Sequence, residues 1–273
     1  MVVLRWLGAA GVELSYEGSV VLLDPYLSRV SKLALLAGRS LKPDMARLQG
    51  YLREIETPVE SIVVSHTHFD HALDVPPLAR LTEARVIGSS SLGTLMRAAG
   101  NQDQLTVCLG GETLPLPSGG SVTMLKSRHG LVALGRVPYP GEIDRHTPLP
   151  WAAGDYREGC VFAPLVELGG IRILHLGSAN FEEEALRGLH CHALLLCVPG
   201  WQRVPRFVAR LFEMVTAELV IPFHYDDFTA PLDIDRTAPK LPFQGIPKLV
   251  AEIRRHAPAT RVMLPRPFEV VRL

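Results

Sequence analysis

The sequence has few cysteines, few lysines and no long apolar run. Its four cysteines, Cys108, Cys160, Cys191 and Cys197, form no Cys-x-x-Cys pair in 273 residues. A disulfide framework or a cysteine-built zinc finger is therefore not indicated, and a reduced, cytoplasmic setting is expected. No apolar run approaches the roughly 18 residues of a transmembrane helix. The first residues lack the charge pattern and cleavage site of a signal peptide.

A net charge is also missing, because 28 basic residues balance 28 acidic ones. This balance predicts no binding to nucleic acid or to an anionic membrane. Arginine supplies 23 of the basic residues, so bidentate anion binders are available. The hydrophobic content of 47% is ordinary for a globular protein. We expect a single domain over residues 1–273, and a homo-oligomer stays open.

The most informative segment is His66-Thr67-His68-Phe69-Asp70-His71, which follows the apolar run 61–65. Imidazole and carboxylate donors suit one or two Zn²⁺ ions, and they also suit Fe²⁺ or Mn²⁺. On extended backbone His66 and His68 point the same way and can share one ion. Asp70 and His71 follow where the chain turns, so they can face a second ion. A buried strand before the cluster would place these ligands on a loop at its carboxyl end.

Apolar periodicity predicts alternating strands and helices. Strands are expected near 12–16, 20–23, 59–65, 85–88, 121–126, 131–137, 161–167, 171–176, 192–198, 219–223 and 261–271. Helices are expected at about 43–56, 75–83, 90–99, 181–188, 203–216 and 246–256. Two long segments, 138–160 and 225–245, break the pattern and are expected to overhang the metal site.

The hexapeptide resembles the signature His-x-His-x-Asp-His of the metallo-β-lactamase superfamily. Leu22-Leu23-Asp24-Pro25 is similar to that family's strand ending in a structural Asp. The chain looks most similar to small hydrolases related to ascorbate-6-phosphate lactonase and to phospholipase D enzymes acting on N-acyl lipids. This resemblance implies an α/β fold, a four-layer αββα sandwich with the metal site at the seam. It also implies that His129 joins His66 and His68, and that His224 joins Asp70 and His71.

One position departs from that family. The family carries Gly-Asp where this chain has Gly177-Ser178, and that Asp bridges two metal ions. A neutral hydroxyl is a poor ligand and does not offset the charge of two dications. We therefore expect the second group, Asp70, His71 and His224, to hold its ion weakly.

The resemblance implies a metal-dependent hydrolase that uses metal-activated water on an ester, lactone or phosphodiester. In this hypothesis Asp70 takes a proton during turnover if the second ion is absent, and His224 or Tyr225 then stabilises the developing oxyanion. Arg128 and Arg145 are the expected anchors for a small anionic substrate, and Trp151 is expected to contact it.

Two alternatives stay open, a degenerate metal-binding scaffold with little hydrolysis and a mononuclear iron oxygenase. Two further histidine positions are interpreted as structural. His190-Cys191-His192 is expected at a helix-to-strand junction without metal, and His175 is expected in the core, pointing away from the face that bears Ser178.

Overall fold

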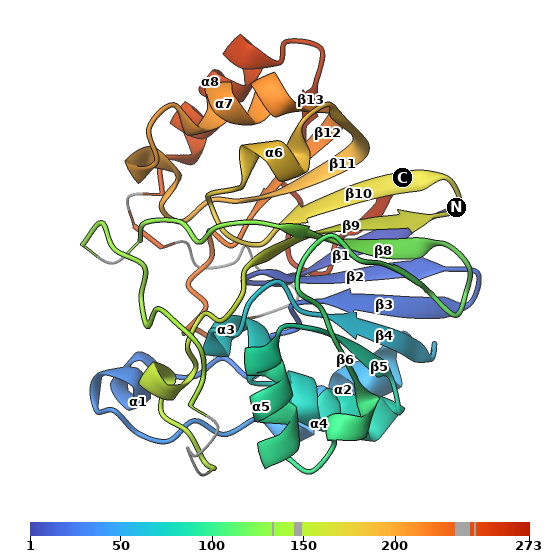
Figure 1. Ribbon diagram of the computed structural model, residues 1–273, viewed down its shortest axis with the longest axis vertical. Helices are drawn as coiled ribbons and strands as arrows, with labels where there is room; N and C mark the ends of the chain where they lie inside the picture. Colours follow the sequence, from blue (N-terminus) through green and yellow to red (C-terminus); the bar gives the residue numbers. More distant parts are fainter. Residues whose placement is uncertain (133, 145–148, 233–240, 243) are drawn as a thin grey trace.

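The computed structural model describes residues 1–132, 134–144, 149–232, 241–242 and 244–273. In this part of the chain the strands form two seven-stranded sheets that pack face to face, with helices on both outer faces (Figure 1). The α/β class and the predicted four-layer αββα sandwich are thereby confirmed. No helix of the described residues is long and apolar enough to cross a membrane.

The first sheet has the strand order β14-β1-β2-β3-β4-β5-β6. Its strands are β1 Val3–Gly8, β2 Gly11–Tyr16, β3 Ser19–Leu23, β4 Val59–Val63, β5 Arg85–Gly88, β6 Leu105–Val107 and β14 Val270–Arg272. Strands β3 to β6 are parallel neighbours, so their carboxyl ends meet at one edge. Its helical layer contains α2 Met45–Ile55, α3 Phe69–Ala72, α4 Val75–Thr82 and α5 Ser90–Ala98, and a short α1 spans Lys32–Leu36.

The second sheet has the order β13-β12-β11-β10-β9-β8-β7. Its strands are β7 Thr113–Pro115, β8 Ser121–Lys126, β9 Phe162–Leu168, β10 Ile171–Leu176, β11 Leu189–Cys197, β12 Val215–Phe223 and β13 Arg261–Val262. Helices α6 Glu183–Leu186, α7 Phe207–Met214 and α8 Ile246–His256 cover its outer face (Figure 1). A parallel run from β10 to β12 again gathers carboxyl ends at one edge.

Buried side chains form two clusters that match the layers. One cluster joins the facing sheets and continues under α7 and α8, with Leu14, Val122 and Leu174 fully buried. The other lies between the first sheet and its helices and includes Leu48, Ile62 and Leu78. Both sheets are thus covered on both faces, which explains why most residues of their parallel strands are apolar.

Three predicted elements differ from the structure. The described residues of 131–137 form a loop instead of a strand, because Leu134 and Gly135 adopt positive φ values of 51° and 73° and turn the chain. The predicted strand 261–271 is divided between β13 and β14, which belong to different sheets. His190-Cys191-His192 lies inside β11 and not at a junction. All six predicted helices are present, and α6 and α7 are shorter than expected.

Candidate metal centre

The hexapeptide lies where β4 leaves the first sheet. β4 ends at Val63, His66 and His68 follow in the connecting loop, and α3 begins at Phe69. Asp70 and His71 therefore lie in the first turn of a short helix. This change from loop to helix is what turns the second pair of ligands away from the first.

The six predicted ligands form two groups in the structure. The first group is His66, His68 and His129, and the second is Asp70, His71 and His224. Within each group the potential ligand atoms all lie within 4.8 Å of one another. His129 follows β8 and His224 follows β12, so each group combines ligands from both sheets. The arrangement is the one that the resemblance implied.

Backbone carbonyl groups orient two imidazoles of the first group. His68 Nε2 donates to the carbonyl oxygen of Pro138 at 2.8 Å, and His129 Nδ1 donates to that of Gly130 at 2.7 Å. Each ring thus keeps its other nitrogen as a lone-pair donor for an ion. Fixing the tautomer through the remote nitrogen is how proteins commonly orient metal-binding histidines.

His66 supplies direct evidence that the residues fit a metal ion. Its Nδ1 lies 3.1 Å from Ser65 Oγ, while its Nε2 is buried without a hydrogen-bond partner among the described residues. Burial of an unpaired polar nitrogen is unfavourable, and a bound cation would satisfy it.

The first group is also in the protonation state that metal binding needs. Burial lowers the pKa of His66 well below its ordinary value, and neighbouring imidazoles lower it further. Burial likewise lowers the pKa of His68 to about 4 and that of His129 to about 3. All three rings are therefore neutral near pH 7, and neutral imidazole is the ligand form.

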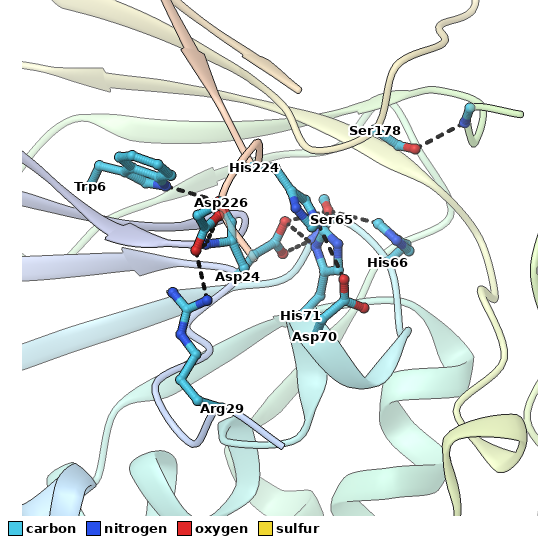
Figure 2. Close-up of polar contacts among 12 residues, drawn as sticks. Trp6, Asp24, Arg29, Ser65, His66, Asp70, His71, Ser178, His224 and Asp226 are labelled. Atoms are coloured by element: carbon cyan, nitrogen blue, oxygen red, sulfur yellow. Dashed lines mark hydrogen bonds and ion pairs between the residues drawn. The ribbon is translucent and has the colours of Figure 1, made fainter. Parts of the chain in front are cut away.

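A fully buried carboxylate, Asp24, lies beside the second group and contacts its His71 (Figure 2). Its Oδ2 accepts hydrogen bonds from His71 Nδ1 at 2.8 Å and from His175 Nε2 at 2.9 Å. Its Oδ1 accepts the Ser65 backbone N–H at 2.6 Å. Burial opposes its ionisation, but His71 and these hydrogen bonds hold the pKa of Asp24 below its usual range. His175 is in the core as predicted, yet it contacts the carboxylate that orients a ligand.

The other two members of the second group contact each other. His224 Nε2 lies 3.2 Å from Asp70 Oδ2 (Figure 2). Burial would raise the pKa of Asp70, but the hydrogen bond from His224 and the charge of His71 lower it. For His71 the attraction of Asp24 outweighs burial and raises the pKa. The second group therefore contains an ionised carboxylate and a basic imidazole.

A buried ion pair fixes the loop that carries His224, whose φ is 64°. Arg29 Nη1 lies 2.7 Å from Asp226 Oδ2, and Asp226 Oδ1 also accepts the Ala9 N–H at 2.9 Å. A Cβ on Gly8 would lie 1.7 Å from the Arg29 guanidinium, so only glycine fits there. Asp226 belongs neither to the hexapeptide 66–71 nor to the segment 22–25. It joins the His224 loop to the first sheet.

Ser178 lies at the edge of the site and faces the loop of His129. Its Oγ accepts the Gly130 N–H at 2.9 Å (Figure 2). The hydroxyl thus holds the backbone next to a ligand of the first group, and the position brings no negative charge. Its effect on metal binding stays a prediction.

Several predicted substrate residues lie away from the ligands. Arg128 Nε pairs with Glu182 at 2.5 Å. Trp151 is fully buried in the core under the first helical layer, where its ring packs edge-on to Tyr156. Tyr225 packs against Trp6 with ring centroids 5.0 Å apart, and burial raises its pKa to about 12. These placements do not fit the roles predicted for the three side chains. Arg145 lies outside the described residues.

The segment 138–160 is only partly an overhanging loop. Ile143, Trp151 and Tyr156 are buried in the core of the first helical layer. Among the described residues of this segment, only Pro138 and Tyr139 line the cavity next to the ligands. The prediction that 138–160 overhangs the metal site is therefore wrong for these three buried residues, which fill the core of the first helical layer instead.

Five of the six candidate ligands line a cavity of about 340 Å³. Its described lining includes all ligands except His66, together with Ser178 and Cys197. Other lining residues are Phe69, Val132, Pro138, Tyr139, Gly177, Pro199, Phe228, Leu241 and Gln244. Most of this lining is apolar, and a small molecule can reach the ligands from it.

Comparison with known proteins identifies the family. Residues 20–225 match the model of the beta-lactamase superfamily domain, and the chain belongs to this superfamily. A metal-dependent hydrolase of Polynucleobacter asymbioticus is 25% identical over 82% of this chain and 74% of its own length. One of Anaeromyxobacter dehalogenans is 29% identical over 82% and 75%. The predicted superfamily is confirmed, as is a metal-dependent hydrolase at this coarse level.

Solved structures show the same fold. Igni18, a metallo hydrolase from Ignicoccus hospitalis, superposes with a TM-score of 0.63 at 16% identity, covering 99% of this chain and 97% of its own. CmlA, a diiron beta-hydroxylase from Streptomyces venezuelae, gives a TM-score of 0.61 at 15% identity and covers all of this chain but 54% of its own.

Proposed function

We propose that this protein is a metal-dependent hydrolase that cleaves an ester, lactone or phosphodiester bond of a small molecule. The observation that carries the proposal is the pair of ligand groups beside one cavity, each built from both sheets. Membership in the superfamily and the hydrolase relatives support it. The roles of the six ligands are part of the proposal.

The donor set favours Zn²⁺, and it also suits Fe²⁺ or Mn²⁺. Three neutral imidazoles are typical of catalytic zinc, and an imidazole–carboxylate set is shared by zinc, iron and manganese. His66, His68 and His129 would hold one ion, and Asp70, His71 and His224 a second. A bound dication supplies a Lewis acid and lowers the pKa of water towards 7.

The chain's own side chains would then manage protons. If the second ion is absent, the ionised carboxylate of Asp70 is free to accept a proton from the attacking water. His224 borders the cavity and can donate a hydrogen bond to the developing oxyanion. Tyr225 is left out of this mechanism, because its ring packs against Trp6.

A cytoplasmic location and a single domain are part of the same proposal. All four cysteines are free, which fits a reduced, cytoplasmic environment. Pairing of β14 with β1 brings the last strand into the first sheet and supports one domain over residues 1–273.

One other activity has a specific observation in its favour. The fold neighbour CmlA is described as a diiron beta-hydroxylase, so an iron oxygenase is the second candidate. A degenerate scaffold is the third, because Ser178 supplies no bridging carboxylate.

Metal analysis of protein purified without added metal separates the three. We expect at least one zinc ion per chain, with the second ion bound more weakly, and hydrolysis of simple esters. His68→Ala should lose metal and hydrolysis together, whereas the matched control His190→Ala, on the surface beside Glu218, should keep both. Iron instead of zinc, one or two ions per chain, would favour the oxygenase. No retained metal and no hydrolysis after zinc addition would contradict the proposal.

A further inference from the structure

The cavity wall beyond the ligands is apolar and uncharged. None of its described lining residues is lysine or arginine. Phe69, Phe228 and Leu241 line one part of it, and Val132 and Tyr139 line another. A charged substituent placed against such a wall would lose hydration without gaining a partner.

An aromatic ring stands next to each ligand group. Phe228 packs edge-on to His224 with centroids 5.7 Å apart, and it lies 6.1 Å from Phe69. Tyr139 packs edge-on to His68 at 6.5 Å. A molecule held at the ligands therefore meets an aromatic surface on either side.

The turn that presents Tyr139 is strained, and it also orients a ligand. Tyr139 has a φ of 42°, a conformation that bulky side chains rarely adopt. The preceding carbonyl, that of Pro138, accepts the hydrogen bond from His68. One turn thus places an aromatic ring and a ligand imidazole together, and the ring is still 46% exposed.

The arginine nearest to a ligand in sequence does not offset the apolar wall. Arg128 precedes His129, but its guanidinium is paired with Glu182 and is absent from the cavity lining. Phosphate and carboxylate substituents are usually bound by such cations. The described wall therefore matches an uncharged substituent.

We infer that the substrate is a carbonyl ester or lactone with an uncharged, apolar acyl group, and that Tyr139 and Phe228 determine this specificity. The inference rests on the proposed function. In the reaction the oxygen of water forms a bond to the acyl carbon and the acyl–oxygen bond breaks. One proton of the water passes to the leaving alkoxide, which becomes the alcohol, or in a lactone the hydroxyl group of the opened ring. The other proton goes to solvent, and the acid is released as its anion.

Binding of alkyl hydroxamates to the zinc-loaded protein tests the wall without turnover. Hexanohydroxamate has four more methylenes than acetohydroxamate, and each fully buried methylene strengthens binding about fourfold. With part of the chain buried, we expect hexanohydroxamate to bind at least about tenfold more tightly. Phe228→Ala and, independently, Tyr139→Ala should each reduce this ratio severalfold, because the loss of affinity is larger for hexanohydroxamate than for acetohydroxamate. Leu264→Ala, at an exposed leucine outside the lining, is the matched control.

Hydrolysis supplies the second arm, with p-nitrophenyl hexanoate, p-nitrophenyl acetate and bis(p-nitrophenyl) phosphate as probes. We expect the largest kcat/KM for the hexanoate, reduced in Phe228→Ala mainly through KM. A ratio of hydroxamate affinities near one, or preferred cleavage of the phosphodiester, would overturn the inference and leave the hydrolase proposal standing. Absence of all hydrolysis by zinc-loaded protein would instead overturn the proposed function, while the hydroxamate ratio still tests the apolar wall.

Discussion

The two ligand groups lie side by side but are supported differently. The first consists of three neutral imidazoles, and its supporting hydrogen bonds reach two backbone carbonyls and the hydroxyl of Ser65. The second contains the ionised Asp70, and Asp24 stands behind His71. Since Ser178 brings no charge, both carboxylates that can offset bound cations belong to the second group or its support.

The first group is therefore expected to bind its ion mainly through the geometry of its imidazoles, and the second mainly through charge. The first group should select an ion by the fixed directions of its ring nitrogens. The second should depend on buried charges that must first be kept ionised inside the protein. Changes at each support should therefore have different consequences for folding and for metal binding.

The largest effect is expected from Asp24→Ala. The change leaves His71, His175 and Ser65 without their common acceptor, and breaking a buried charge pair costs about 3–5 kcal/mol. Because folding lowers the pKa of Asp24 below 3.8, its contribution is present above pH 3.8 and is lost as the pH falls further. Urea unfolding of metal-free protein at several pH values measures this, with the exposed Glu184→Ala as control. Equal stability of variant and wild type would contradict the role of Asp24.

The next effect concerns the first group alone. His66→Ala or His68→Ala should remove most of the bound metal while the protein still folds, because both residues lie in a loop after β4. Elemental analysis and circular dichroism measure the two quantities, and His190→Ala is the control. Metal content equal to the wild type in either variant would show that the assignment is wrong.

A smaller effect is expected at Ser178. Ser178→Asp adds a carboxylate next to the cavity and should tighten the second group about ten- to hundredfold, the range seen when groups around a metal change. Zinc titration of metal-free wild type against the variant measures the change. Two equally tight sites in the wild type would mean that the absent bridge is already replaced.

The smallest effect is a difference in pH dependence. The raised pKa of His71 means that an ion entering the second group must displace a proton, so affinity should fall up to about tenfold per pH unit below that pKa. The first group, with pKa values of about 4 and 3 for His68 and His129, should change little between pH 8 and 6. Zinc affinities of His66→Ala and His71→Ala isolate the groups, and parallel profiles would contradict this difference.

Local patterns were enough to predict the hexapeptide's place after β4 and most helices, whereas the four-layer fold was implied by the family resemblance. Ligands far apart in sequence, His129 and His224, needed the family resemblance, because a single histidine after an apolar strand carries no signal of its own. Ser178 also needed the family resemblance, because only the comparison with the family's Gly-Asp makes this serine informative.

Sequence patterns could not reveal contacts made by backbone atoms or by distant side chains. The carbonyl of Pro138 that orients His68 belongs to no motif. Asp226 and Arg29 are 197 positions apart, and each looks like an ordinary surface charge. Trp151 was misassigned for the reverse reason, since an aromatic residue in a proline-rich segment suggests exposure when it in fact fills the core.

The origin of each ligand group from both sheets has a consequence for folding. His66 and His129 are 63 positions apart, and His71 and His224 are 153 apart. An ion in either group would act as a reversible cross-link between segments that are far apart in the sequence. Bringing such segments together costs chain entropy, and docking of the two sheets has already met this cost when the ion binds. Metal binding is thereby coupled to docking of the two sheets, and a chelator would loosen the seam between them before it disturbed either sheet.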